Sequence, residues 1–169
     1  MPLAARILLS IWLGSLAAVH PQGQTRPDFS GTWRFDRAQS AKPWRDGRTV
    51  IAAILGDPCV ASQDAAALTL TMTVGGSQVK AIYNFEGESR NHSPGAQGQP
   101  DIPVTSRASW DGDTLVIVST STSVAQGEDV TVETRRVIRI DVDGNLIIER
   151  TGTPVSQVTP SRSVYTRAR

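Results

Sequence analysis

Arg136 is the residue of this chain best suited to bind an anion. In the alternating stretch VTVETRRVIRID it lies on the same side as Val132, Thr134 and Ile138, which predicts an inward-facing arginine. A buried guanidinium is costly without a partner, and it can receive the carboxylate of an amphipathic ligand. Two alternatives stay open. A bulge at Arg135-Arg136 would return both side chains to solvent, or an internal glutamate would pair with Arg136.

Two other arginines, Arg107 and Arg150, are expected to be solvated, because they face outward or lie near the ends of alternating stretches.

Nucleophilic and metal chemistry have little support. Cys59 is the only cysteine, so no intrachain disulfide forms, and a catalytic thiol would need a nearby histidine, of which the chain has only His20 and His92. These residues do not make a zinc site. Ser156 lies in GTPVS, which lacks the glycines of a nucleophile elbow. We therefore expect a protein that is not an enzyme and has no cofactor or metal, with Cys59 as a half-buried packing residue.

Residues 86–101, EGESRNHSPGAQGQPD, form the one region in which an enzyme site could be hidden. As a connection this stretch is long for a compact domain, which is typical of a functional rim or a loosely ordered loop. A site there would use its polar side chains, namely Glu88, Arg90, Asn91, His92 and Asp101. Alternatively, the loop is the contact surface of an envelope accessory or structural protein with a filled core.

The stretch 141–145, DVDGN, is compatible with either a calcium loop or a turn. An EF-hand loop has its glycine at the sixth position and a glutamate at the twelfth. Here Gly144 is fourth and lies between two alternating stretches, which favours a tight turn, and Asp111-Gly112-Asp113 repeats the pattern.

Most of the chain has a period of two and is rich in β-branched residues, which predicts half-buried strands. The alternating stretches cover residues 28–36, 68–74, 78–85, 104–110, 114–121, 130–141, 145–151 and 162–168. Gly75-Gly76 and the two Asp-Gly pairs fall between them, as in hairpins. We expect an all-β fold, an antiparallel up-and-down meander of about eight or nine strands that forms a barrel or half-barrel. One short helix is expected after the first strand, over residues 46–56.

The opening FSGTW resembles the first strand of lipocalins and fatty-acid-binding proteins, in which a Gly-x-Trp lies at the closed end of an up-and-down barrel. The resemblance implies a lipocalin-like fold with Gly31 and Trp33 at that end. It also implies that an arginine of the last strand, Arg162 or Arg167, packs over the Trp33 ring. The Thr-Asp-Tyr turn of lipocalins and the Arg-x-Tyr of fatty-acid-binding proteins are absent.

A second resemblance runs from residue 28 to the end of the chain. DFSGTW, SWDGDTLVI and DVDGNLIIERTG followed by SVYTR are similar to segments of small exported bacterial proteins that have no established activity. This resemblance implies export and a lipocalin-like β-barrel, and it implies nothing about a ligand.

The first residues, MPLAARILLSIWLGSLAAVH, are typical of an export signal: Arg6 precedes an apolar run that ends in small residues. We expect a signal peptide over residues 1–24, cleaved somewhere in 17–24, and a single β-barrel-like domain over 25–169. An uncleaved anchor is the alternative, although the run is short for a membrane span. The mature chain would be periplasmic or secreted, with no membrane span.

The charge of the chain argues against polyanionic partners. Its formal net charge is +1, and loss of Arg6 leaves equal numbers of basic and acidic residues. Nucleic acid is therefore not expected as a partner, and no particular protein partner is indicated.

Together these features predict an exported, non-enzymatic β-barrel that binds a small apolar or anionic amphipathic molecule. Binding sites of this kind are mostly apolar with a few fixed polar groups. The inward side chains expected to line or floor the pocket are Trp33, Leu70, Met72, Tyr83, Trp110 and Arg136.

Overall fold

The computed structural model describes most of the chain after residue 25. The described stretches are residues 26–41, 52–74, 76–95, 99–125, 127–156 and 158–168. The expected signal peptide, residues 1–24, lies outside them. Within these stretches, no helix combines the length and the apolar character needed to cross a membrane.

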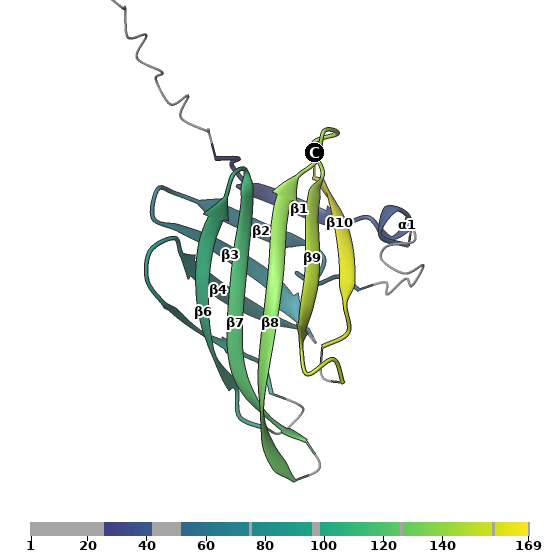
Figure 1. Ribbon diagram of the computed structural model, residues 1–169. Helices are drawn as coiled ribbons and strands as arrows, with labels where there is room; N and C mark the ends of the chain where they lie inside the picture. The colour runs from purple at the N-terminus through teal and green to yellow at the C-terminus, as the bar shows by residue number, and fades with distance from the viewer. Residues whose placement is uncertain are drawn as a thin grey trace, which may run out of the picture.

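Ten antiparallel strands in the described part of the chain form one continuous sheet (Figure 1). Their order in the sheet is β4-β3-β2-β1-β10-β9-β8-β7-β6-β5. The strands are β1 (Gly31–Phe35), β2 (Cys59–Gln63), β3 (Ala67–Val74), β4 (Ser77–Asn84), β5 (Ser89–Ser93), β6 (Ile102–Asp111), β7 (Thr114–Ala125), β8 (Glu128–Ile140), β9 (Leu146–Thr153) and β10 (Ser161–Arg167). One short helix, α1 (Arg37–Ser40), follows β1.

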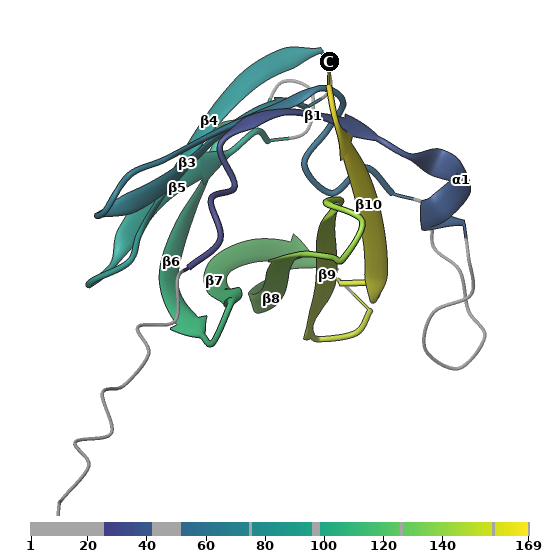
Figure 2. The same ribbon diagram turned by 90° about the horizontal axis from the view of Figure 1, so that it is seen from above.

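The sheet curves around its inner face into a nearly closed barrel (Figure 2). The first and last strands are hydrogen-bonded neighbours, with Trp33 opposite Arg167 and Phe35 opposite Tyr165. The two edge strands, β4 and β5, are consecutive in the chain and lie beside each other. The expected all-β, up-and-down barrel with one short helix after the first strand is therefore confirmed.

Two strands, β2 and β5, are not predicted by the alternation of apolar and polar residues. On β2 the buried side chains are the small ones of Cys59 and Ala61, and β5 contains no apolar residue. Alternation of large apolar residues cannot reveal such strands. Because β5 lies within residues 86–101, the expected long loop is divided into a short turn, a strand and a second connection.

The expected hairpin turns are confirmed. Gly112 and Gly144 have positive φ values of 63° and 80° between consecutive strands. In the β8–β9 turn, the Asp141 carboxylate accepts hydrogen bonds from the backbone N–H groups of Asp143 at 3.0 Å and Asn145 at 2.8 Å. Residues 141–145 thus form a tight turn that is closed by its own aspartate.

The helix lies earlier than expected. Asp36 caps α1, because its carboxylate accepts the backbone N–H of Gln39 at 2.9 Å. Residues 46–51 lie outside the described stretches, and residues 52–56 form a turn instead of a helix, with the N–H of Gly56 donating to the carbonyl of Ala53 at 2.9 Å. That turn carries the side chain of Leu55 into the core, which explains the apolar cluster in its sequence.

Trp33 is fully buried at the centre of β1. Its indole N–H donates to the carbonyl of Phe29 at 2.8 Å, and the Arg167 guanidinium lies 4.7 Å from the ring centroid. Arg167, rather than Arg162, is therefore the arginine that packs over the tryptophan. At Gly31, φ is +137°, which favours glycine, and a Cβ atom there would lie 2.8 Å from Nη1 of Arg167, so the guanidinium would have to shift.

One core surrounds Trp33 on the inner face of the barrel. Its buried members are Phe29, Trp33, Leu55, Cys59, Ala61, Leu68, Leu70, Ala81, Tyr83, Ala108, Leu115, Ile117, Ile138, Leu146, Ile148 and Tyr165.

Candidate ligand-binding site

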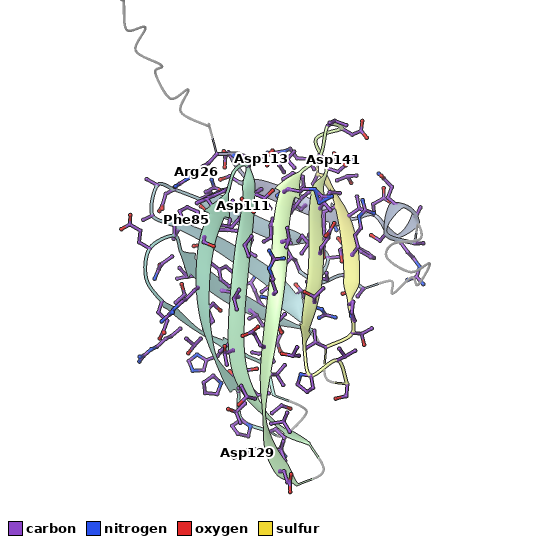
Figure 3. All side chains as sticks on the ribbon, viewed as in Figure 1. Arg26, Phe85, Asp111, Asp113, Asp129 and Asp141 are labelled. Atoms are coloured by element: carbon purple, nitrogen blue, oxygen red, sulfur yellow. The ribbon has the colours of Figure 1, made fainter. Side chains whose placement is uncertain are left out.

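The two ends of the barrel are distinguished by their turns. Asp111, Asp113 and Asp141 lie at one end of the long strands, and Asp129 lies at the other (Figure 3). We call the first the floor end and the second the mouth end.

The inner face changes character from the floor end to the mouth end. On β7 the inward side chain of Leu115, near the floor end, is fully buried, whereas that of Ser123, near the mouth end, is partly exposed. On β8 the same change occurs between Ile138 and Val130. Solvent therefore reaches the inner face from the mouth end, while apolar side chains fill the floor end.

Arg136 lies between these two regions and faces inward, as expected. The β8 register is continuous through Arg135, and Arg136 lies opposite Ile117 of β7 and Arg150 of β9. The bulge alternative is therefore wrong. The Arg136 guanidinium donates to the hydroxyl of Tyr83 across the barrel, with 3.1 Å between Nη1 and Oη. No described carboxylate forms an ion pair with it.

Arg150 also faces inward, directly opposite Arg136, and corrects the expectation that it is solvated. It shares the side of β9 that buries Leu146 and Ile148, so the alternation in NLIIERT could have revealed it. Burial, and then the neighbouring charge of Arg136, lower the pKa of Arg150. The Nε atoms of both arginines are buried without a hydrogen-bond partner among the described residues.

The surroundings of the arginine pair are polar but not acidic. On the inward side of the described strands the only acidic residue is Glu128, at the mouth-end tip of β8 and eight residues from Arg136. Hydroxyl groups lie on the same inner face: Ser106 Oγ and Ser119 Oγ lie 2.8 Å apart, and the buried Oγ of Ser161, opposite Arg150, has no described partner. Two like charges on neighbouring strands repel each other, and burial strengthens that repulsion. This arrangement is suited to binding an anion.

No family model and no curated protein sequence matches the chain.

The six side chains predicted to line a pocket all lie on the inner face, but they divide into two groups. Trp33, Leu70 and Tyr83 are buried core residues, whereas Met72, Trp110 and Arg136 are partly exposed. Of the six, Tyr83 and Arg136 form a direct hydrogen bond.

Trp110 belongs to an aromatic cluster at the floor end. Its ring stacks on Phe29 with 5.7 Å between centroids, and Phe85 packs against it at 5.3 Å. The guanidinium of Arg26 covers the Trp110 ring at 5.3 Å. The cluster covers the inner face at this end, away from the arginine pair.

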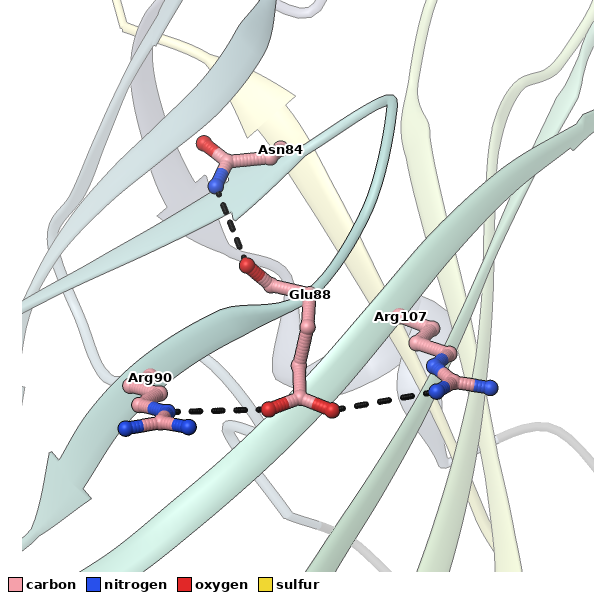
Figure 4. Close-up of polar contacts among 4 residues, drawn as sticks. All are labelled: Asn84, Glu88, Arg90 and Arg107. Carbon is pink, nitrogen blue, oxygen red and sulfur yellow. Dashed lines mark hydrogen bonds and ion pairs between the residues drawn. The ribbon is translucent and has the colours of Figure 1, made fainter.

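The polar residues of 86–101 make local contacts. The Glu88 carboxylate lies between two arginines, with 3.6 Å from Oε1 to Nε of Arg90 and 3.8 Å from Oε2 to Nη2 of Arg107 (Figure 4). The backbone carbonyl of Glu88 accepts a hydrogen bond from the Asn84 side chain. Both arginine side chains are largely exposed, so these pairs contribute little to stability.

Cys59 is fully buried rather than half-buried. Burial raises the pKa of its thiol to about 12, so the thiol remains protonated at neutral pH and is a poor nucleophile. Within the described stretches, no three His, Cys, Asp or Glu side chains lie close enough together to hold a metal ion.

Proposed function

We propose that this protein is an exported, non-enzymatic β-barrel that binds a small amphipathic anion on its inner face. The observation that carries the proposal is the inward pair Arg136 and Arg150, with no acidic side chain beside it on the described inner face. Partly buried charges without an acidic partner are costly, and an anionic ligand would offset that cost on binding.

The head group of the ligand would be a carboxylate or a related oxyanion. A guanidinium presents planar N–H donors whose spacing matches such groups. The Tyr83 hydroxyl and the Ser161 hydroxyl lie beside the two arginines and can add neutral hydrogen bonds.

The apolar part of the ligand would extend from the arginine pair toward the mouth end. Several inward apolar side chains there are partly exposed, and an apolar chain would shield them from water. These side chains are Met72, Val79, Ile102, Val104, Val130 and Val132.

Two fluorescent probes that differ mainly in charge test this proposal. The sulfonate 1-anilinonaphthalene-8-sulfonate is expected to bind, whereas its uncharged relative N-phenyl-1-naphthylamine binds through apolar contacts alone. Arg136→Leu and Arg150→Leu should each weaken sulfonate binding by about 10- to 100-fold, as expected for loss of a charge-assisted hydrogen bond. Affinity for the uncharged probe should be unchanged.

The matched control is Arg107→Leu, which removes an exposed arginine from the outer face. Equal effects of this variant and of Arg136→Leu on sulfonate binding would contradict the proposal. So would a protein that binds both probes equally before and after substitution.

The natural ligand and the expected export can be examined on one sample. Native mass spectrometry of protein purified from its own host should show an excess mass that is lost on denaturation. The denatured mass should correspond to a chain that has lost a segment ending within residues 17–24. A bare native mass would argue for a barrel filled by its own side chains.

A further inference from the structure

The barrel has one seam, between β4 and β5, that side chains close instead of backbone pairing. At Ile82 the backbone N–H donates to Oδ1 of Asn91 at 2.8 Å, and the carbonyl accepts from Nδ2 at 2.9 Å. Next to the turn, the N–H of Asn84 donates to the Ser89 hydroxyl at 2.7 Å. The Asn91 carboxamide thus occupies the position that a peptide group of a neighbouring strand would take.

The seam-facing backbone of β4 continues beyond Asn91. Alternate residues of a strand direct their backbone groups to the same side. Because Ile82 and Asn84 face the seam, Lys80 and Gln78 face it as well. No hydrogen bond joins the seam side of Lys80 or Gln78 to a described residue.

A hollow of about 360 Å³ lies beside these two residues. Four consecutive residues of β4, Ser77–Lys80, line one side of it, and His92, Pro94 and Asp101 line the other. Side chains of consecutive strand residues point to opposite faces, so a hollow lined by all four runs along the edge of the strand. The hollow therefore continues the seam where β5 ends at Ser93.

We propose that this seam binds a short extended peptide, which pairs with β4 as an additional strand. The Asn91 carboxamide already makes the two hydrogen bonds that such a peptide would make at Ile82. The incoming peptide would make the corresponding bonds at Lys80 and Gln78, which is the geometry of recognition by β-strand addition.

Charge selects the outward side chain of the peptide. Lys80 and His92 share the outward face on the two sides of the hollow, and no described carboxylate forms an ion pair with either residue. An acidic side chain is therefore favoured at the peptide position between them. Asp101 lines the same hollow and disfavours a second acidic residue. The flanking peptide residues point inward beside Val79, so they are apolar.

Peptide binding can be followed by NMR on the isotope-labelled chain. The probe is acetyl-TVEVT-amide, and the charge-reversed control is acetyl-TVKVT-amide. We expect the first peptide to shift the amide signals of Gln78 and Lys80 and to slow their hydrogen exchange. The second should bind at least about tenfold more weakly, since it replaces an attraction with a repulsion worth over 1 kcal/mol.

Backbone pairing is tested on both partners. Lys80→Pro removes a seam-facing N–H that takes no part in the β3 ladder, and it should weaken binding of the acidic peptide by about tenfold. Methylation of the glutamate nitrogen in the peptide should have a similar effect without any change to the protein. Lys80→Gln keeps the backbone bonds, so it should mainly abolish the preference for the acidic peptide.

Three results would overturn the proposal. The first is the absence of shifts at Gln78 and Lys80 at millimolar peptide, as expected if Lys80 only protects the edge from pairing. The second is shifts confined to the surroundings of Arg136 and Arg150, which would mean that the acidic peptide binds there as an anion. The third is self-association of the chain through β4, which would make a second copy the partner.

Discussion

At the scale of single residues, Gly31, Trp33 and Arg167 act as one unit. The glycine leaves space for the arginine, the arginine covers the tryptophan ring, and the indole N–H holds the carbonyl of Phe29. Nη1 of Arg167 also donates to the carbonyl of Ser30 at 2.9 Å. These contacts join the residues before β1 to the last strand, so they stabilise the point at which the barrel closes.

Trp33→Ala should lower the free energy of unfolding by about 3–5 kcal/mol, because the side chain is fully buried and leaves a cavity. Urea unfolding monitored by circular dichroism measures this loss. The matched control is Arg34→Ala, an exposed neighbour on the same strand, which should change stability by less than about 0.5 kcal/mol. A loss below about 1 kcal/mol for Trp33→Ala would show that β1 is peripheral to the stability of the barrel.

Sequence could identify single inward residues where a strand has a clear apolar side. Arg136 was found because Val132 and Ile138 define the inward side of β8. Leu146 and Ile148 give the same signal for Arg150, but its place near the end of the alternating stretch leads to the expectation of a solvated side chain. Arg136 and Tyr83 are in contact although their strands are distant in the sequence. The alternation of apolar and polar residues along a strand does not show which strands face each other across a barrel.

At the scale of elements, residues close together in the sequence specify the turns, but they do not specify the edge strands of the sheet. Three residues, Asp141, Gly144 and Asn145, determine the β8–β9 turn, in which the Asn145 side chain donates to Asp141 at 3.2 Å. By contrast, β5 pairs with β6 through its backbone, and only the side chains of Ser89 and Asn91 join it to the backbone of β4. A strand of this kind has no apolar period, so the sequence pattern could not predict it.

The β8–β9 turn should contribute a pH dependence to stability. Slight burial raises the pKa of Asp141, but hydrogen bonds from Asn145 and Asp143 and the charge of Arg139 outweigh it, so the pKa is lowered overall. A lowered pKa stabilises the fold above the unfolded value of about 3.9, and this contribution is lost as the pH falls through the folded value.

Asp141→Asn should therefore lower the midpoint temperature of unfolding at pH 6. Toward pH 2 this midpoint temperature should converge with that of the unsubstituted protein. Thermal unfolding across this pH range measures both values. Asp143→Asn is the control, because its carboxylate makes no hydrogen bond to a described residue. A constant difference between Asp141→Asn and the unsubstituted protein at all pH values would rule out the ionised carboxylate as the cause.

At the scale of the whole molecule, the two ends of the barrel differ in how tightly their inward side chains are packed. Apolar side chains fill the floor end, hydroxyl groups and valines line the mouth end, and the arginine pair lies between the two regions. Sequence predicts the barrel, because period two and hairpin turns are local signals, but it does not predict every inward residue, as Arg150 shows. The gradient of solvent exposure depends on the curvature of the closed sheet, so it could not be predicted from any single strand.

The order of the strands in the sheet has a consequence for the speed of folding. The break in the sheet falls between β4 and β5, in the middle of the chain, whereas the two terminal strands are paired. Pairing β1 with β10 therefore requires the closure of nearly the whole chain, and such distant contacts slow folding.

A circular permutant would remove this requirement. New termini in the turn at Gly87, with a flexible linker from Ala168 to Arg26, would place the strands in the chain in the same order as in the sheet. Stopped-flow refolding of the permutant should be several-fold faster than that of the original chain, because every strand would then pair only with its neighbour along the chain. Equal refolding rates would mean that the first and last strands meet only after the slowest step has been passed.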